Sequence, residues 1–444
     1  MRTQRTILSA LFGLTQFVAV GNSGVYSLGL SDNENVHDSP IPGFVGPEGE
    51  GIVPTEVSED SNVVNPIFLS WADTVIDYSP ALGEVAPGFE SVREPLFKDP
   101  AAALGPVTGL QEYDVVSLGE LNEASILAGD QPGMLTVAFS EPIVDGTGAD
   151  FVIFENAIIL SILDTGGAGI GGIWTELAYV EVSSNGTDFA RFPAHTPGLS
   201  IVGPYGSNDP RNIYNLAGKH VNADGDSWGT PFDLSDLEDH PLVVSGDLDL
   251  DQITQIRLID IPGSGDFLDA FGNPIYDGWI TYDTGGADIE ALGAISQKQT
   301  FERWNSNRGF EPLGNDDNDQ WCHLQEYAFG LDPGQFEQGN IPDLQAQPDG
   351  NYTLSFPRDE RITDIDYVVE QQGTNSPSNS WTEIARFSGF EEPAIDDSAI
   401  LTLEISSTAN QAAIGVLQKI TLLLPPPSGP EFGVFYRIRL EATE

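Results

Sequence analysis

The chain has 444 residues, enough for roughly two or three domains, and its 17 basic and 68 acidic side chains give a formal net charge of −51. Such a surface repels phosphate backbones and anionic lipid headgroups, so we expect no nucleic-acid partner. Cys322 is the single cysteine, which leaves a large core, bound metal, or both as sources of stability in place of an intramolecular disulfide.

The first residues have the pattern of a secretory signal peptide. Arg2 and Arg5 precede an apolar stretch, residues 6–20, which is followed by small residues. We therefore expect residues 1–23 to be removed and the protein to be secreted or held at the cell surface. This stretch is too short and too polar to span a bilayer, and no later segment is long and apolar enough. Residues 24–65, rich in Gly, Pro, Asp, Glu and Ser, are predicted to form a flexible lead-in.

Residues 66–296 are predicted to form one large β-sandwich or jelly roll. Short apolar runs recur between clusters of Gly, Pro, Asn and Asp, and helical periodicity is weak. The predicted strands begin at Asp114, Met134, Phe151, Leu177, Ile253 and Ile289. Long loops, notably residues 164–172 and 196–233, connect them, and such loops on a rigid scaffold commonly carry binding sites.

Several predicted strands carry a carboxylate inside or at the edge of an apolar run. In DFVIFENA, the alternation of side chains places Glu155 on the same face as Phe151 and Ile153. Asp260 in RLIDIPG and Asp288 in GGADIEALGAI have similar settings. Carboxylates that converge inside a sandwich repel one another unless a cation lies among them, and Ca²⁺ prefers oxygen ligands. Two interpretations stay open: Glu155, Asp260 and Asp288 hold a structural Ca²⁺, or each leaves its strand end for water.

Aromatic side chains in turn-rich segments provide a second type of candidate site. Trp174, Trp228, Tyr276 and Trp279 lie in such segments. Exposed rings stack on the apolar faces of sugars, whereas buried rings only fill the core. We expect these four residues to form the recognition surface for a glycan or another extracellular ligand.

An acidic loop has the spacing of an EF-hand-type calcium site. With Asn315 as position one, Asp317, Asp319 and Glu326 occupy positions three, five and twelve. Asn315 replaces the usual first Asp, and Gln320 replaces the Gly that permits a sharp turn at position six. The loop is therefore either a weak calcium site or a solvated acidic linker.

This loop belongs to a predicted connector, residues 297–337, which precedes a smaller C-terminal β-sandwich, residues 338–444. After the loop, LQEYAFG is predicted to be a short helix that ends at Gly330. The strand patterns of the second sandwich are NYTLSFPRD, DYVVEQQG, SWTEIARFSG, ILTLEISS, KITLLL and GVFYRIRL.

Two sets of motifs resemble known families. LTVAFSEPIVDGTGADFVIFENA, ELAYVEVSSNGTDFARFP, ITQIRLIDIPG and GGADIEALGAI follow one another within residues 114–295. They resemble a family of bacterial secreted "cell surface proteins", some with PEP-CTERM sorting tails, which implies a β-sandwich and an extracellular location. LQEYAFGLDP, YTLSFPR, DYVVEQQ, WTEI and FYRIRL are similar to C-terminal modules of secreted proteins from Verrucomicrobia-type bacteria. This second resemblance implies an accessory or surface-association domain.

These patterns predict an exported, all-β binding protein with structural Ca²⁺ rather than an enzyme, and no catalytic residue is assigned. A polysaccharide-active enzyme is one alternative, because glycoside hydrolysis needs only two carboxylates at a set separation and the chain has 68 acidic side chains. A structural envelope protein or adhesin without a small-ligand site is the other alternative.

Overall fold

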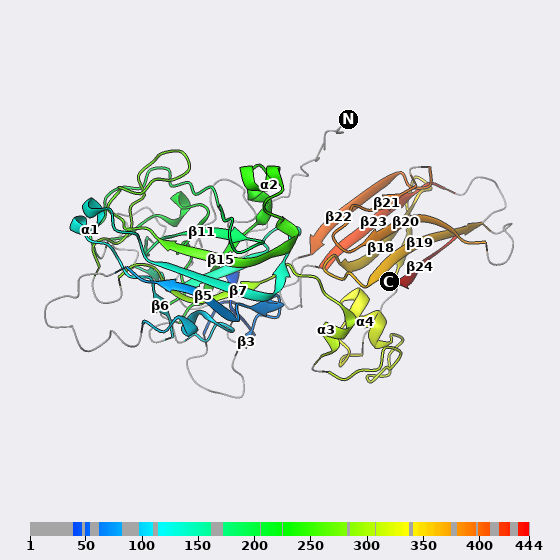
Figure 1. The fold of residues 1–444 in the computed structure, drawn as a ribbon. Coiled ribbons are helices and arrows are strands. Elements are labelled where there is room, and N and C mark those ends of the chain that lie inside the picture. Colours follow the sequence, from blue (N-terminus) through cyan, green and yellow to red (C-terminus); the bar gives the residue numbers. More distant parts are fainter. Residues whose placement is uncertain are drawn as a thin grey trace.

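The chain folds into two β-sandwiches and a helical connector (Figure 1). The predicted all-β class is confirmed. The computed structural model describes residues 39–46, 49–53, 62–81, 97–109, 114–160, 172–204, 206–223, 225–281, 285–306, 308–336, 341–373, 380–396, 398–408, 417–426 and 434–443. The predicted signal peptide, residues 1–23, and the first part of the predicted lead-in lie outside the described residues.

Two six-stranded antiparallel sheets form the first sandwich. The first sheet has the order β1 (Ile41–Pro42), β14 (Trp228–Phe232), β8 (Phe151–Glu155), β16 (Asp288–Ala294) and β4 (Ser70–Trp71), with β6 (Val116–Ser117) paired to β16. The second sheet has the order β12 (Ala190–Arg191), β11 (Ala178–Ser183), β15 (Ile253–Asp260), β7 (Met134–Ile143) and β5 (Thr74–Ser79), with β13 (Leu216–Ala217) paired to β11. Two short pairs lie outside these sheets: β2 (Phe44–Val45) with β3 (Val63–Val64), and β9 (Ile158–Ile159) with β10 (Ile173–Trp174).

Strand β8 is buried on both faces, which explains its apolar sequence. Phe151 and Ile153 belong to the large apolar cluster between the two sheets. Val152 and Phe154 belong to a second cluster, on the opposite face, that the N-terminal segment covers. Because side chains alternate along a strand, Glu155 continues the row of Phe151 and Ile153 at the end of the inner face. The predicted alternation in this strand is therefore confirmed.

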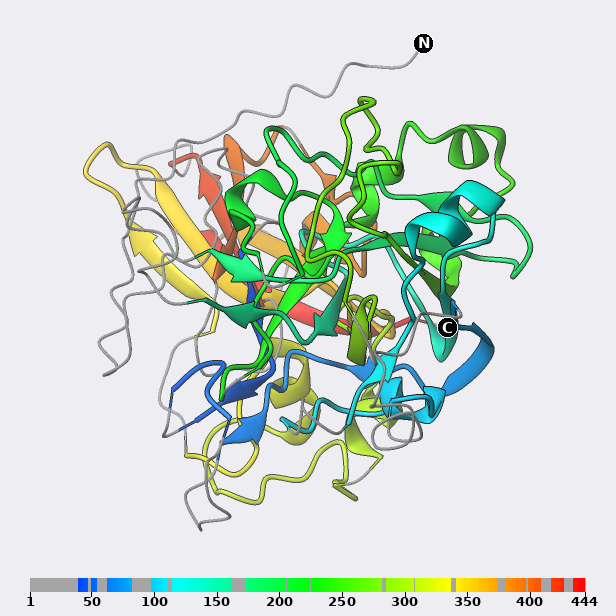
Figure 2. The same cartoon turned by 90° about the vertical axis from the view of Figure 1, so that its left-hand side faces the viewer.

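Short helices lie in the loops of the first sandwich. They are α1 (Glu123–Ala128), α2 (Pro241–Ser245), η2 (Pro100–Ala103), η4 (Pro210–Asn212), η5 (Leu234–Leu237) and η6 (Leu250–Gln252). Asn122 caps α1 by accepting a hydrogen bond from the backbone N–H of Ser125. Helix α1 lies at the end of the first sandwich that is farthest from the C-terminal sandwich in Figure 1. This end of the first sandwich faces the viewer in Figure 2. Within the described ranges, no helix has the length and apolar character needed to cross a bilayer.

The C-terminal sandwich consists of two four-stranded antiparallel sheets. The first of these sheets has the order β17 (Asp343–Ala346), β18 (Tyr352–Asp359), β23 (Leu417–Leu424) and β22 (Thr402–Thr408). The second has the order β21 (Ala394–Ile395), β20 (Thr382–Ser388), β19 (Ile365–Gly373) and β24 (Val434–Ala442). The connector contributes α3 (Phe301–Asn305) and α4 (His323–Phe329). Helix α4 confirms the predicted short helix and ends at Gly330, which adopts the left-handed conformation. Tyr327, Ala328 and Phe329 of α4 belong to the core of the C-terminal sandwich.

The two sandwiches contact each other directly. Arg361, only 4% exposed, pairs with Asp359 at 2.7 Å and donates a hydrogen bond of 3.1 Å to the carbonyl of Ile295 in the first sandwich. The backbone N–H of Thr147 donates a hydrogen bond of 2.8 Å to Glu360. Both contacts come from the end of the first sandwich opposite α1.

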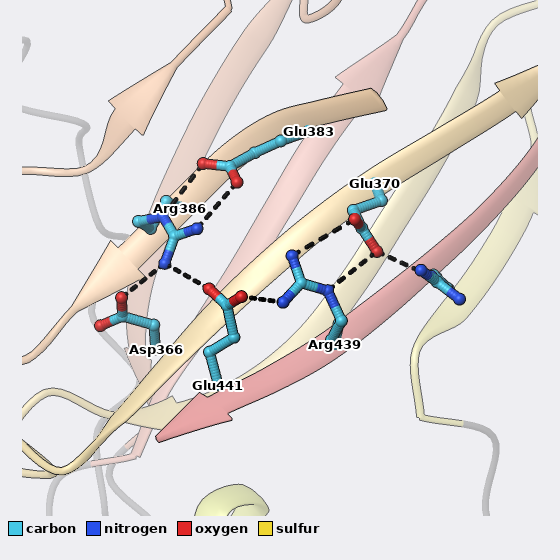
Figure 3. Close-up of polar contacts among 7 residues, drawn as sticks. Asp366, Glu370, Glu383, Arg386, Arg439 and Glu441 are labelled. Carbon is cyan, nitrogen blue, oxygen red and sulfur yellow. Dashed lines mark hydrogen bonds and ion pairs between the residues drawn. The ribbon is translucent and has the colours of Figure 1, made fainter. Parts of the chain in front are cut away.

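A polar network lies across β20, β19 and β24 (Figure 3). Arg386 pairs with Asp366, Glu383 and Glu441 at 2.6–2.8 Å. The other members are Arg437, Arg439 and Glu370, with Arg439 also pairing with Glu441. Burial alone would raise the pKa of Glu370, but hydrogen bonds from Arg437 and Arg439 outweigh it and hold the pKa below the usual value.

We expect Glu370→Gln to lower the free energy of unfolding by about 1 kcal/mol at neutral pH, because two arginines lose their charged acceptor. A group with a lowered pKa stabilises the fold above its unfolded pKa, so this difference should shrink as the pH falls below about 4. Urea denaturation at low salt measures it. Glu383→Gln is the matched control, since Glu383 is more exposed, at 41% of its side chain against 8% for Glu370. Equal losses of unfolding free energy in the two variants would contradict a special stabilising role of Glu370.

Candidate cation site

Six acidic side chains gather at one end of the first sandwich, where strands of both sheets end or begin. They are Glu155 at the end of β8, Asp288 at the start of β16, Asp260 at the end of β15, Glu176 just before β11, Glu120 after β6, and Asp277 between β15 and β16. Each is at most 4% exposed. We call these six residues the strand-end cluster.

The sheet register explains why these residues meet. Glu155 pairs with the residue that follows Asp288, so the end of β8 lies beside the start of β16. In the facing sheet, Ala178 pairs with Asp260, so Glu176, two residues before Ala178, lies just beyond the end of β15. The structure therefore brings together Glu155, Asp260 and Asp288, the three residues predicted from the strand patterns.

The segment that enters β16 ties three of the carboxylates together. The N–H of Gly286 donates to Glu176 Oε1 at 3.1 Å, and the N–H of Ala287 donates to Asp260 Oδ1 at 2.9 Å. The next residue is Asp288. Gly286 has a φ of +80°, and a Cβ there would lie 2.8 Å from Asp260 Oδ1. Only glycine allows the backbone to approach the carboxylates this closely.

Thr281 bridges two other members of the cluster. Its hydroxyl oxygen lies 2.7 Å from Glu120 Oε2 and 2.6 Å from Glu176 Oε1. Its backbone N–H also donates to Glu120 Oε2, at 2.6 Å. A hydroxyl has one hydrogen, so it can donate to only one of the two carboxylates at a time.

Three buried oxygens of the cluster have no hydrogen-bond partner among the described residues. They are Glu155 Oε1, Asp260 Oδ2 and Asp288 Oδ1. A buried polar atom without a partner is costly, and a buried charge more so. The second oxygen of each group is bonded: the N–H of Ala157 donates to Glu155, and Asn156 donates to Asp288.

Glu290, another buried carboxylate of β16, shows how hydrogen bonds alone can satisfy such a group. It is 2% exposed and accepts from the N–H and hydroxyl of Thr108, the N–H of Gly109 and the amide of Asn222, all at 2.8–3.0 Å. Both of its oxygens are bonded. The strand-end cluster lacks this saturation, and its unbonded oxygens point to a missing positive partner.

Burial is the main influence on the acidity of the cluster. It raises the pKa of Glu120 and of Asp288 to about 7. Burial raises the pKa of Glu155 and Glu176 well above the usual value, and the neighbouring charge of Asp288 raises both further. Burial, and to a smaller extent the charge of Glu120, raises the pKa of Asp260 well above its usual value. The site therefore favours either bound protons or a bound cation.

The spacing of the oxygens differs from that of a compact cage. Within the part of the chain that the structure describes, three acidic side chains bring oxygens within 4.8 Å of one another in two groups: Asp145, Asp150 and Asp233, and Asp317, Asp319 and Glu326. In the first group, both oxygens of Asp150 already accept backbone N–H bonds, from Gly146 and Leu234. The strand-end cluster is neither of these groups, so an ion held there would need backbone carbonyl or water oxygens in addition to carboxylates.

The second group lies in the acidic connector loop. Asp317, Asp319 and Glu326 converge there as the EF-hand-type spacing predicts, and Glu326 is fully buried on α4. Asn315 braces the loop by donating from Nδ2 to the carbonyl of Asp319 at 2.8 Å. In this loop Asn318 has a left-handed backbone conformation, with a φ of 62°, which Asn tolerates better than most residues. The loop therefore turns without glycine at position six.

Two of the predicted aromatic residues border the strand-end cluster. Trp174 lies two residues before Glu176, and its Nε1 donates to the carbonyl of Pro204 at 2.8 Å. Trp279 lies two residues before Thr281, and its Nε1 donates to the carbonyl of Leu121 at 3.0 Å. Both residues are half-buried.

The other two predicted aromatic residues differ in setting. Trp228 is the first residue of β14, so it lies in a sheet rather than in a loop as predicted. Its ring packs against Gly51, where a Cβ would lie 2.3 Å from the ring. Tyr276 is half-buried beside Asp277, and its ring packs against Gly265. The structure thus places Trp174, Tyr276 and Trp279 next to the cluster in sequence, and Trp228 on β14, beside β8 in the sheet that carries Glu155 and Asp288.

Glu120, Glu176 and Asp277 were missed by reasoning from the sequence. None of them lies inside a strand, so the alternation that identified Glu155 does not apply to them. The available signal is composition: each acidic residue stands beside apolar or aromatic residues, in LGEL, WTEL and IYDGW.

The fold and site together define an all-β, two-sandwich protein with a buried acidic cluster between strand ends. No protein-family model matches the chain. No curated protein matches it either.

Proposed function

We propose that this is an exported binding protein whose recognition loops are held in place by Ca²⁺ at the strand-end cluster. The observation that carries the proposal is the set of three buried, unbonded oxygens of Glu155, Asp260 and Asp288, on strands from both sheets. Ca²⁺ takes six to eight oxygen ligands at about 2.3–2.6 Å, including carboxylates, carbonyls and water. Such an ion would offset the burial of the carboxylates and join the two sheets at this end.

The recognition surface is assigned to the loops that border the cluster. Thr281, Glu176 and Asp277 connect these loops to the carboxylates, and Trp174, Tyr276 and Trp279 lie within two residues of them. Half-buried aromatic rings suit stacking against the apolar face of a sugar. A glycan or another uncharged or basic extracellular ligand is the class that the net charge of −51 favours.

Two sequence features support an extracellular setting. The N-terminal pattern is that of a signal peptide, and residues 114–295 resemble bacterial cell surface proteins. A chain with a single cysteine gains no intramolecular disulfide outside the cell, so a metal ion is an alternative source of stability there.

The connector loop provides a second proposed Ca²⁺ site. Asp317, Asp319 and Glu326 supply oxygens that already lie close together, and Asn315 completes the predicted set. Because Glu326 belongs to α4, which packs into the C-terminal sandwich, an ion here would stabilise that domain.

We expect Asp317→Asn combined with Asp319→Asn to remove one Ca²⁺ from the protein and to abolish the stabilisation of the C-terminal sandwich by calcium. With calcium at 10 to 100 times the dissociation constant, that stabilisation is about 1–3 kcal/mol. Isothermal titration calorimetry counts the ions, and urea denaturation with and without calcium reports the stability. Asp316→Asn is the control, since 68% of that side chain is exposed. An unchanged ion count in the double variant would contradict this site.

The proposed function is tested by melting the mature protein in calcium and in chelator, followed by a glycan array under both conditions. We expect a higher melting temperature in calcium, and glycan binding that is lost in chelator. The absence of a calcium-dependent shift would remove the metal from the proposal. A shift without binding to any glycan would favour a structural role at the cell surface.

A further inference from the structure

We infer that the hairpin of residues 267–275 is a ligand-contacting part of the recognition surface, with the ring of Phe271 as a stacking platform for an uncharged glycan. This inference rests on the proposed function, because the hairpin directly precedes Tyr276 and Trp279 in the connection between β15 and β16. It adds a contact residue that the sequence patterns did not single out.

Phe271 is the exposed aromatic residue of this connection. Its side chain is 71% exposed at the tip of the hairpin, whose two arms meet in a bridge between Leu268 and Pro274. Trp174 and Trp279, by contrast, are half-buried, and each donates its Nε1 hydrogen to a backbone carbonyl. A single exposed apolar side chain is ordinary on a protein surface. What distinguishes Phe271 is the set of groups that hold it in place.

The carboxylate of Asp269 fixes the backbone that carries Phe271. Its Oδ1 accepts hydrogen bonds from the N–H groups of Phe271 at 2.9 Å and Asn273 at 2.8 Å. Its Oδ2 accepts from the N–H of Thr196 and from Asn273 Nδ2, both at 2.9 Å. Burial alone would raise the pKa of Asp269, but these hydrogen bonds outweigh it and lower the pKa. The tip is therefore ordered before a ligand arrives, which reduces the entropy lost on binding.

Aromatic neighbours support the Phe271 ring from one side. The ring centroids of Phe271 and His195 lie 4.5 Å apart, and His195 stacks on Tyr214 at 5.8 Å. Two backbone hydrogen bonds, of 3.0 and 3.1 Å, join His195 to Tyr214. Because Phe271 stays 71% exposed despite this support, most of its ring surface is available to stack on the apolar face of a sugar.

The surface of the hairpin tip is uncharged, unlike the chain as a whole. Asp269 is the only ionisable residue in the hairpin, and it is 6% exposed and hydrogen-bonded through both oxygens. The exposed residues are Leu268, Ala270, Phe271, Gly272 and Pro274. In a chain with a net charge of −51, this tip favours a ligand without charge, whereas a basic partner would be drawn to the acidic surface elsewhere. Neutral sugars combine apolar ring faces with the absence of charge.

The test measures binding of the full mature chain, in calcium, to four soluble polysaccharides by affinity gel electrophoresis. Laminarin, hydroxyethyl cellulose and galactomannan are uncharged, and alginate is acidic. We expect the wild type to bind at least one uncharged polymer and not alginate. Phe271→Ala should weaken this binding by about tenfold or more, whereas Phe271→Tyr keeps the ring and should retain most of the affinity.

Val244→Ala is the matched control. Val244 is 72% exposed on α2, outside the recognition loops, so this variant removes a similar exposed apolar group and should bind like the wild type. Because Val244 and Phe271 are both exposed, we expect all three variants to melt at the wild-type temperature.

Other outcomes overturn the inference. Equal binding by the wild type and Phe271→Ala would remove Phe271 from the recognition surface and leave the proposed function in place. A preference for alginate would contradict an uncharged ligand. No binding to any of the four polysaccharides would contradict both the inference and the glycan ligand of the proposed function. Self-association of the wild type that Phe271→Ala abolishes, measured by size-exclusion chromatography with light scattering, would assign the hairpin tip to a contact between copies of the chain.

Discussion

Replacing Glu155 by Gln and Asp288 by Asn is expected to raise the melting temperature in chelator and to abolish its further increase in calcium. Without a cation, the protein must bury these two groups beside other carboxylates, and burial raises the pKa of Asp288 from 3.8 to about 7. Removing that ionisation should stabilise the calcium-free protein by on the order of 4 kcal/mol at slightly alkaline pH. For a domain of this size, the increase in melting temperature is about 10 °C.

In calcium the difference in stability between the two proteins narrows to about 1 kcal/mol or less. The wild-type protein gains about 3 kcal/mol when calcium is at 100 times its dissociation constant, and the variant lacks the ligands for that gain. Differential scanning calorimetry in chelator and in calcium measures both effects. Glu290→Gln is the matched control, because Glu290 is equally buried but fully hydrogen-bonded. We expect it to destabilise the protein in both conditions and to preserve the calcium shift. Equal destabilisation of the Glu155, Asp288 variant in both conditions would contradict a cation at these residues.

The calcium-free protein is also expected to lose stability as the pH rises from about 5 to about 8. The pKa values of Glu120 and Asp288 are raised by burial to about 7 in the fold, above 4.5 and 3.8 for the unfolded groups. A group with a raised pKa contributes stability that is complete below the unfolded pKa and is lost as the pH rises through the folded pKa. Each of these two groups accounts for a loss on the order of 3 to 4 kcal/mol.

Calcium should flatten this pH dependence, because a ligated carboxylate is already ionised and binding releases its protons. Denaturation midpoints across the pH range, with and without calcium, measure the slopes. The net charge of −51 adds a general self-repulsion that also grows with pH. The decisive comparison is therefore between the slopes of stability against pH of the calcium-free wild type and of calcium-free Asp288→Asn. The slope of Asp288→Asn should be shallower. Parallel slopes would contradict the assigned role of Asp288.

Much of the first sandwich was predictable because its central strands are buried on both faces or alternate strictly. Strands β7, β8, β11, β15 and β16 were all predicted from their apolar runs. β14 was missed because Gly229 and Pro231 resemble a turn. The structure accommodates the proline because β1 pairs only with Trp228 and Gly229, so Pro231 lies where β14 has no neighbour on that side among the described strands.

The candidate site was predictable only where strand alternation applied. Glu155 and Asp260 end strands whose inner faces could be identified, and Asp288 starts another. Glu120, Glu176 and the bridging Thr281 come from loops, whose paths depend on tertiary contacts that no local pattern encodes. The aromatic residues show the same limit, since the ring of Trp228 packs against Gly51, which is distant in the sequence.

The most direct test of a cation at the strand-end cluster is anomalous diffraction from crystals of the mature protein grown in calcium. We predict anomalous peaks inside the strand-end cluster, at about 2.3–2.6 Å from Glu155 Oε1 and Asp288 Oδ1. Protonated carboxyl groups bonded to one another or to water at this position, with no anomalous peak while calcium is present in the crystal, would contradict it.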